Sequence, residues 1–216
     1  MLLPSNPERT IKIVTGSLRD IHDVDVIVSS ENTDLQPSRY YDPTMSGTLR
    51  YLDAEKNDFD LRVTRDAYLD SLEAAKLKAD VHVPVQPGAV IVAPTTGLRQ
   101  QHVKYVFHAA TVQGAIETGY SAREDVIDQA IRNCFRRFSD LCKTETLQTI
   151  LFPAFGGGTG GLWPDTVARR MIAAIEHGMN EHDEVRQVVM FARLEAHRRA
   201  LRAAAESAGW PRKGQR

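Results

Sequence analysis

Short apolar runs recur along the chain and predict a series of strands. The segment 11–16 alternates apolar and polar positions, which is the period of a half-buried strand. Other runs are mostly apolar, as in strands whose two faces are both covered. The pattern predicts six strands, over 11–16, 24–29, 88–93, 105–110, 149–153 and 185–192.

Apolar positions three and four residues apart predict the helices. The clearest helix follows the capping box Ser121-Ala122-Arg123-Glu124, in which a glutamate stands three positions after a serine. Its apolar face comprises Ile127, Ile131, Cys134, Phe135, Phe138 and Leu141. Further helices are predicted from about 46, over about 59–78, over about 165–177 with Gly178 ending the helix, and over 198–207.

The order of these elements indicates the fold class. The later part of the chain alternates strand with helix, which is typical of parallel strand pairs covered by helices. We therefore expect an α/β protein. We expect an N-terminal arm over 1–10, one domain over 11–208 and a flexible tail over 209–216.

Composition and charge restrict the class of protein. The chain has 216 residues, of which 42% are hydrophobic and 25% charged, as in a folded soluble domain. The formal net charge of −1 does not favour general nucleic-acid binding. No apolar stretch approaches membrane length, so we expect no membrane partner. We expect a monomer without a cofactor.

The cysteine and histidine positions bear on compartment and metal binding. Cys134 and Cys142 lie eight positions apart on one predicted helix, too far for a disulfide. Two free thiols are typical of a reducing compartment, so we expect a cytoplasmic protein. His177 and His182 flank a helix end without a third ligand, so no metal site is predicted.

A glycine-rich segment directly follows the strand 149–153. Glycines remove the Cβ atoms and permit positive φ angles, so that successive backbone N–H groups can converge on an anion. This segment therefore predicts a phosphate or diphosphate site, although a turn whose glycines serve only packing is the alternative. It lacks the Gly-Lys-Ser/Thr of a P-loop and the position of a dinucleotide fingerprint. The candidate ligands are Phe155, Gly156, Gly157, Gly158, Thr159, Gly160 and Gly161.

Four segments resemble, in order and spacing, stretches of the macrodomain family, whose members bind ADP-ribose. The segment 14–18 is similar to the family's first strand and turn, and 25–32 to its Asp-Ala-Ile-Val-Asn-Ala-Ala-Asn stretch. The segment 104–108 is similar to its Lys-Tyr-(Val/Ile)-(Phe/Ile)-His strand, and 149–156 to the strand leading into its second phosphate loop. The resemblance implies a three-layer α/β/α sandwich with a mixed, mostly parallel six-stranded sheet, and a macrodomain over 11–208.

The resemblance also implies binding roles for single residues. The segment 156–161 would cradle the diphosphate and distal ribose, and Asn32 would hydrogen-bond that ribose, although Asn32 could instead cap a turn. Ser17 stands where the family has its adenine-reading aspartate, with Leu18 beside it. The family's adenine-covering aromatic aligns near Ala192, so either the neighbouring Phe191 would cover adenine or no residue would. The family's first glycine triplet is absent. The helix start at Ser46, Gly47 and Thr48 would supply N–H groups in its place.

The activity implied by the resemblance is hydrolysis of an ADP-ribosyl linkage on a modified macromolecule. One branch of the family uses a lysine where this chain has Gln86, which can orient water but cannot form a covalent adduct. Asn32 and Gln86 are therefore the candidate catalytic residues. A non-catalytic ADP-ribose reader is the alternative, and a nucleotide-dependent oxidoreductase is a third. We interpret Asp42 as a turn residue and His108 as a satisfied core histidine.

Overall fold

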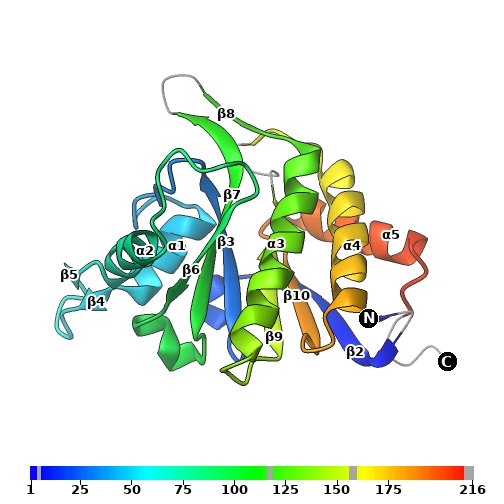
Figure 1. Ribbon diagram of the computed structural model, residues 1–216, viewed down its shortest axis with the longest axis horizontal. Coiled ribbons are helices and arrows are strands. Elements are labelled where there is room, and N and C mark those ends of the chain that lie inside the picture. The colour runs from blue at the N-terminus through cyan, green and yellow to red at the C-terminus, as the bar shows by residue number, and fades with distance from the viewer. Residues whose placement is uncertain (4–5, 116–118, 156–159, 212–216) are drawn as a thin grey trace.

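The computed structural model describes residues 1–3, 6–115, 119–155 and 160–211. A mixed sheet forms the centre of the fold, with strand order β1-β2-β10-β9-β3-β7-β6 and β8 paired to β7 (Figure 1). Strands β2, β10, β9, β3 and β7 are parallel, while β1, β6 and β8 pair antiparallel to their neighbours. The strands are β1 Leu2–Leu3, β2 Asn6–Val14, β3 Val26–Asn32, β6 Val90–Pro94, β7 Tyr105–Ala115, β8 Gly119–Ala122, β9 Thr149–Pro153 and β10 Gln187–Phe191.

Helices cover both faces of this sheet (Figure 1). Helices α1 and α2 lie on one face, and α3, α4 and α5 on the other. A separate two-stranded sheet, β4 Glu55–Lys56 with β5 Val63–Arg65, lies between α1 and α2 in the chain. The helices are α1 Met45–Asp53, α2 Ala67–Lys78, α3 Glu124–Cys142, α4 Pro164–Glu181 and α5 Glu195–Ser207, with 3-10 turns η1 Leu18–Asp20 and η2 Gly97–Gln101.

The α/β class and the mixed, mostly parallel sheet are confirmed, but the sheet has eight strands rather than six. The two extra strands are β1, which has only two residues, and β8, which is partly exposed. Neither carries the apolar run by which a strand is recognised in sequence. The first predicted strand also begins earlier, because β2 starts at Asn6.

Two helix predictions are wrong because hydrogen bonds elsewhere decide the local structure. The capping box does not form. Ser121 belongs to β8 and pairs with Gln113 of β7, and α3 begins at Glu124 without a side-chain cap. The predicted helix over 59–78 begins only at Ala67, where Asp66 Oδ1 accepts the N–H of Leu69 at 3.1 Å. The residues before it form the turn and second strand of the β4–β5 hairpin.

Gly178 does not end its helix, because α4 continues to Glu181. A Cβ atom at Gly178 would collide with the ring of Phe135 on α3. The glycine therefore permits close packing of two helices rather than a left-handed C-cap.

Two further expectations concern the state of the two cysteines and the presence of a membrane-spanning helix. Cys134 and Cys142 are both free, and burial raises the pKa of the Cys134 thiol, so it is not poised for reaction. Within the described residues, no helix is long and apolar enough to cross a membrane. The same residues hold no group of three or more His, Cys, Asp and Glu side chains that could bind a metal ion.

Candidate functional site

The parallel strands bring most of the predicted site residues to one edge of the sheet. Strand β3 ends at Asn32, β9 at Pro153 and β10 at Phe191, and the carboxyl ends of parallel strands share an edge. Backbone hydrogen bonds tie these ends together, because Ala154 N–H donates to Phe191 O at 3.1 Å and Ala192 N–H to Val14 O at 2.9 Å. We call this side of the sheet the carboxyl edge.

The glycine-rich segment leaves β9 at the carboxyl edge. Its residues Gly156, Gly157, Gly158 and Thr159 lie outside the described part of the chain. Phe155 is fully buried and packs edge-on against Phe152, so only its backbone is placed to meet a ligand. Gly160 O accepts the N–H of Ala122 at 3.1 Å, which joins the end of the segment to β8. Gly161 has a φ of +71°, and a Cβ there would meet no atom within 4 Å.

Asn32 and the segment of Gln86 lie side by side. The N–H of Val85 donates to Thr33 O at 2.7 Å, which joins the residues next in sequence to the two candidates. Asn32 Oδ1 accepts the N–H of Gln36 at 3.1 Å, which is the turn-capping role that the sequence allowed. The Nδ2 group of the same amide keeps its capacity to donate to a sugar hydroxyl. Gln86 is exposed next to this turn.

The start of α1 is already hydrogen-bonded within the chain. Thr44 caps the helix, since its Oγ1 accepts the N–H of Gly47 at 3.0 Å and its carbonyl accepts that of Thr48 at 3.1 Å. Ser46 Oγ donates to Glu31 and accepts the N–H of Ser38 at 3.2 Å. An anion at Gly47 or Thr48 would therefore have to displace Thr44.

A tight turn precedes α1 and covers its first residues. Asp42 Oδ2 accepts the N–H of Arg39 at 2.9 Å, so Asp42 acts as the expected turn residue. A Cβ at Gly47 would lie 2.8 Å from Asp42 O, closer than a Cβ atom approaches an oxygen without a clash. Glycine is therefore required where the turn lies against the helix.

Sequence reasoning missed a buried polar cluster beneath Asn32. The carboxylate of Glu31 is 3% exposed and lies within hydrogen-bond distance of Ser29, Ser46 and Tyr68. Burial, followed by the nearby Glu31 charge, raises the pKa of the Tyr68 hydroxyl well above its usual value, so the phenol stays protonated. A glutamate that directly follows the apolar run Val26–Val28 and two serines was the sequence signal for this cluster.

His108 belongs to the same cluster but is not the satisfied core histidine that we expected. It is fully buried, with Nδ1 3.5 Å from Glu31 Oε1 and its ring packed edge-on against Tyr68 at 4.9 Å. Neither ring nitrogen makes a hydrogen bond to the described residues. The interaction with Glu31 is therefore electrostatic rather than a well-formed hydrogen bond.

The predicted adenine residues differ in their access to a ligand. Ser17 is exposed and caps η1, since its Oγ accepts the N–H of Arg19 at 3.1 Å. Leu18 and Phe191 are each 4% exposed and belong to one apolar cluster. The Phe191 ring is therefore packed in the core rather than presented as a stacking surface.

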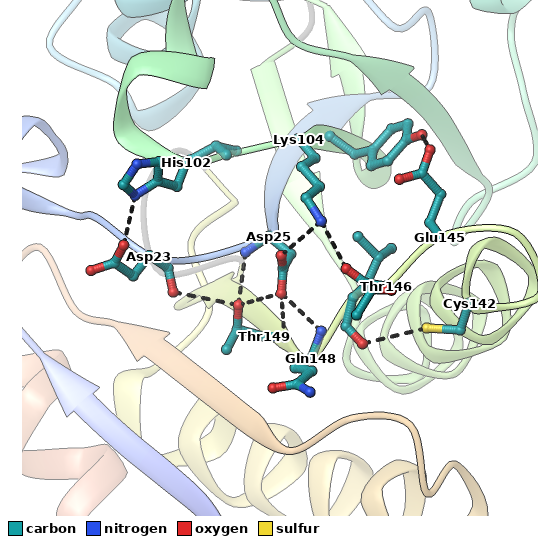
Figure 2. Close-up of polar contacts among 12 residues, drawn as sticks. Asp23, Asp25, His102, Lys104, Cys142, Glu145, Thr146, Gln148 and Thr149 are labelled. Atoms are coloured by element: carbon teal, nitrogen blue, oxygen red, sulfur yellow. Dashed lines mark hydrogen bonds and ion pairs between the residues drawn. The ribbon is translucent and has the colours of Figure 1, made fainter.

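A hollow of about 380 Å³ lies at the opposite, amino edge of the sheet and contains none of the predicted residues. Figure 2 shows its polar groups paired with one another. Asp25 Oδ2 accepts the N–H groups of Gln148 and Thr149 at 2.8 and 2.9 Å, while His102 Nδ1 lies 2.7 Å from Asp23 Oδ1. The contacts of Asp25 join the starts of β3 and β9, so the polar groups of the hollow hold the sheet together. The carboxyl edge therefore remains the candidate site.

Comparisons with known proteins agree with this architecture. A mutant of the Oceanobacillus iheyensis macrodomain with ADP-ribose superposes with a TM-score of 0.67 at 16% identity, covering 94% of this chain and 96% of that one. The same macrodomain with ADP gives 0.64 at 19% identity, covering 93% and 92%. The Trypanosoma brucei macrodomain in complex with ADP-ribose gives 0.62 at 17% identity, covering 90% and 68%.

At these identities the structural likeness shows the fold alone. No curated protein matches the sequence significantly. The Macro domain family, however, matches residues 60–171, which is just over half of the chain. The chain therefore belongs to the Macro domain family.

Proposed function

We propose that this protein binds ADP-ribose at the carboxyl edge and hydrolyses ADP-ribosyl linkages on a modified macromolecule. The observation that supports the proposal is the Thr33–Val85 hydrogen bond of 2.7 Å, because it joins the residues next in sequence to Asn32 and Gln86. Similar structures hold ADP-ribose in proteins of this fold. In this chain the glycine-rich segment 156–161 would hold the diphosphate, and Ser17 would meet the adenine side of the ligand.

The proposed reaction cleaves the bond between ribose C1″ and the modified side chain. Its transition state has oxocarbenium character, so the enzyme needs a positioned water and a fixed ribose more than a strong base. The Asn32 amide would hold the ribose hydroxyls, and the Gln86 amide would orient the water or the leaving group. A carboxamide cannot form an adduct with the sugar, so water attacks directly.

A reader that binds ADP-ribose without turnover is the second candidate. The glutamine at position 86 favours it, because a carboxamide cannot supply the covalent chemistry of the lysine that one branch of the family has there. Hydrolase and reader differ in one measurable respect, which is the release of ADP-ribose.

The domain limits 1–10, 11–208 and 209–216 and the monomeric state also stay predictions.

The test combines calorimetric binding of ADP-ribose with its release from mono-ADP-ribosylated protein and nucleic acid. Asn32→Ala should weaken binding about tenfold, because one good hydrogen-bonding group is worth about 1.4 kcal/mol. Gln86→Ala should lower the release rate at least tenfold with little change in affinity. Gln100→Ala is the matched control, since Gln100 is exposed on η2, beside the amino edge.

The outcomes separate the candidates. Binding without release from either substrate supports the reader. Release that survives both Asn32→Ala and Gln86→Ala shows that other residues act. Gly158→Val should weaken binding sharply, because a branched side chain would stand among the proposed phosphate ligands.

A further inference from the structure

Glu31 is a buried carboxylate immediately beside the proposed ribose ligand Asn32. Its Oε1 accepts the hydroxyl of Ser29 at 2.7 Å, both carboxylate oxygens lie 3.0 Å from Ser46 Oγ, and the Tyr68 hydroxyl lies 3.2 Å away. A buried carboxylate is costly unless such partners surround it. With its partners in place, it holds them at fixed positions.

The partners of Glu31 come from separate parts of the fold. Ser29 lies on β3 with Glu31, Ser46 is in the first turn of α1, and Tyr68 is in the first turn of α2. The carboxylate therefore joins the end of a central strand to the starts of two helices. None of these links is visible in the local sequence, because Ser46 and Tyr68 are 15 and 37 positions away.

The link through Ser46 extends to the turn before α1. The N–H of Ser38 donates to Ser46 Oγ at 3.2 Å, while Ser46 donates to Glu31. Arg50 Nη1 reaches the same stretch by donating to Ser38 O at 3.1 Å. The segment 38–42, which lies against Gly47, is thus connected through one hydroxyl to the carboxylate next to Asn32.

The same strand shifts register beyond Glu31. Glu31 pairs with Ala110 on β7, but Asn32 pairs with Val112, so one residue of β7 is left unpaired at this point. Such irregularities redirect the side chains that follow them. The orientation of Asn32 therefore depends on the residues that anchor the strand just before the shift, of which Glu31 is the last.

We infer that Glu31 is a positioning residue that fixes Asn32 relative to the start of α1 and the turn 38–42. This inference rests on the proposed function, in which Asn32 holds the ribose. The stretch that residues 25–32 resemble has alanine where this chain has Glu31, and this chain also lacks the first glycine triplet. In this chain the turn that stands in place of the triplet is hydrogen-bonded through Ser46 to the carboxylate.

The first test measures local order without ligand. Hydrogen–deuterium exchange of Glu31→Ala should rise at least tenfold over residues 38–48, because Ser46 loses its acceptor. Ser46→Ala should raise exchange over the same residues, and the double variant should add little to either change. Glu31→Gln keeps the size and one acceptor oxygen, and should restore most of the protection.

Thr95→Val is the control for a general loss of stability. Thr95 is 4% exposed, and its hydroxyl donates to Val103 O at 2.6 Å without contact to Ser46. This variant should lower the melting temperature while leaving exchange over 38–48 unchanged. Exchange that rises equally in Thr95→Val, or uniformly along Glu31→Ala, would show that Glu31 only stabilises the fold.

The second test measures ADP-ribose affinity well below the melting temperature. Glu31→Ala should bind about tenfold more weakly and Glu31→Gln within about threefold of the unmodified protein. Increased exchange over 38–48 with unchanged affinity would overturn the positioning role. If the unmodified protein does not bind ADP-ribose, the proposed function fails, while the exchange experiment still decides whether Glu31 orders this region. If Glu31→Ala does not fold, Ser46→Ala and Glu31→Gln carry both tests.

Discussion

The two faces of the sheet are packed in different ways. The face under α3, α4 and α5 is filled by one large apolar cluster, to which β3 contributes Val26 and Val28. The face under α1 and α2 has two smaller apolar clusters, and here β3 places Ser29 and Glu31 beside each other. Because strand side chains alternate, a single strand supplies both environments.

This difference separates stability from positioning. Apolar packing is non-directional, so it stabilises a helix against a sheet without requiring a particular geometry between two atoms. Hydrogen bonds to a buried carboxylate are directional, and they place Ser46 and Tyr68 relative to β3. The face under α1 and α2 is therefore where a ligand site can be held to a defined geometry, and the other face supports it.

The largest expected effect is on the apolar face. Phe135 is fully buried, stacks on Phe152 at 5.8 Å and packs against Gly178. Phe135→Ala should reduce the free energy of unfolding by about 3–5 kcal/mol, measured by urea denaturation. Affinity for ADP-ribose, measured while the variant is fully folded, should change by less than about twofold. A large loss of affinity would show that the two faces are not independent.

An intermediate effect is expected at Asp53, in the last turn of α1. Burial raises the pKa of this carboxyl, although its hydrogen bonds from Thr96 and Leu98 act in the opposite direction. Because the pKa of Asp53 is higher in the folded protein, this carboxyl contributes stability below pH 3.8, its pKa in the unfolded chain. The contribution is lost as the pH rises through the pKa of the folded protein. Asp53→Asn removes the titration and keeps an acceptor oxygen.

The melting temperature of the unmodified protein, relative to that of Asp53→Asn, should therefore fall as pH rises from about 3.5 toward neutrality. Melting curves across this range measure the effect, which should be smaller than that of Phe135→Ala. Thr95→Val, which changes no charge, serves as the control and should follow the pH profile of the unmodified protein. Parallel profiles for Asp53→Asn and the unmodified protein would contradict the prediction.

The smallest effect is expected at Glu195, on the surface of α5. Hydrogen bonds from Arg198 and Arg199 lower the pKa of Glu195 to about 2. A lowered pKa gives stability that is present above the ordinary value of 4.5 and lost as pH falls toward 2. Solvent screens this exposed group, so Glu195→Gln should lower the melting temperature by only about 1–2 °C at neutral pH.

The difference should disappear in about 1 M salt, because exposed charges are then screened. A shift as large as that of Asp53→Asn would mean that this exposed cluster contributes as much to stability as the buried carboxyl of Asp53. Ligand affinity should change little, since Glu195 is exposed and pairs only with Arg198 and Arg199 of its own helix among the described residues.

Local pattern predicted the elements of the apolar-packed face well. The apolar face of α3 is buried as its spacing indicated, and β9 has its predicted bounds. The misses are informative, because Gly178 and Ser121 carry local signals that a helix contact and a strand pairing override. Propensity decides the local structure only where no tertiary contact opposes it.

The candidate site was predictable in position but not in detail. Parallel strands dictate that Asn32 lies at the edge where β9 and β10 also end, and that prediction follows from element order. The resemblance assigned Gln86 and Asn32 their roles separately, and the structure alone shows that their segments meet, through the Thr33–Val85 hydrogen bond. The burial of the Phe191 ring could not be predicted, because the sequence does not show which residues pack over each face of β10.

The sequence by itself determined the α/β class, the order of the main strands and helices, and the edge to which the candidate residues belong. It did so because the period of apolar residues records which positions are buried. Only the tertiary structure decided that Glu31 holds Ser46 and Tyr68. Those contacts join residues from different elements, and a directional bond between them exists only once the fold has brought both atoms within about 3 Å.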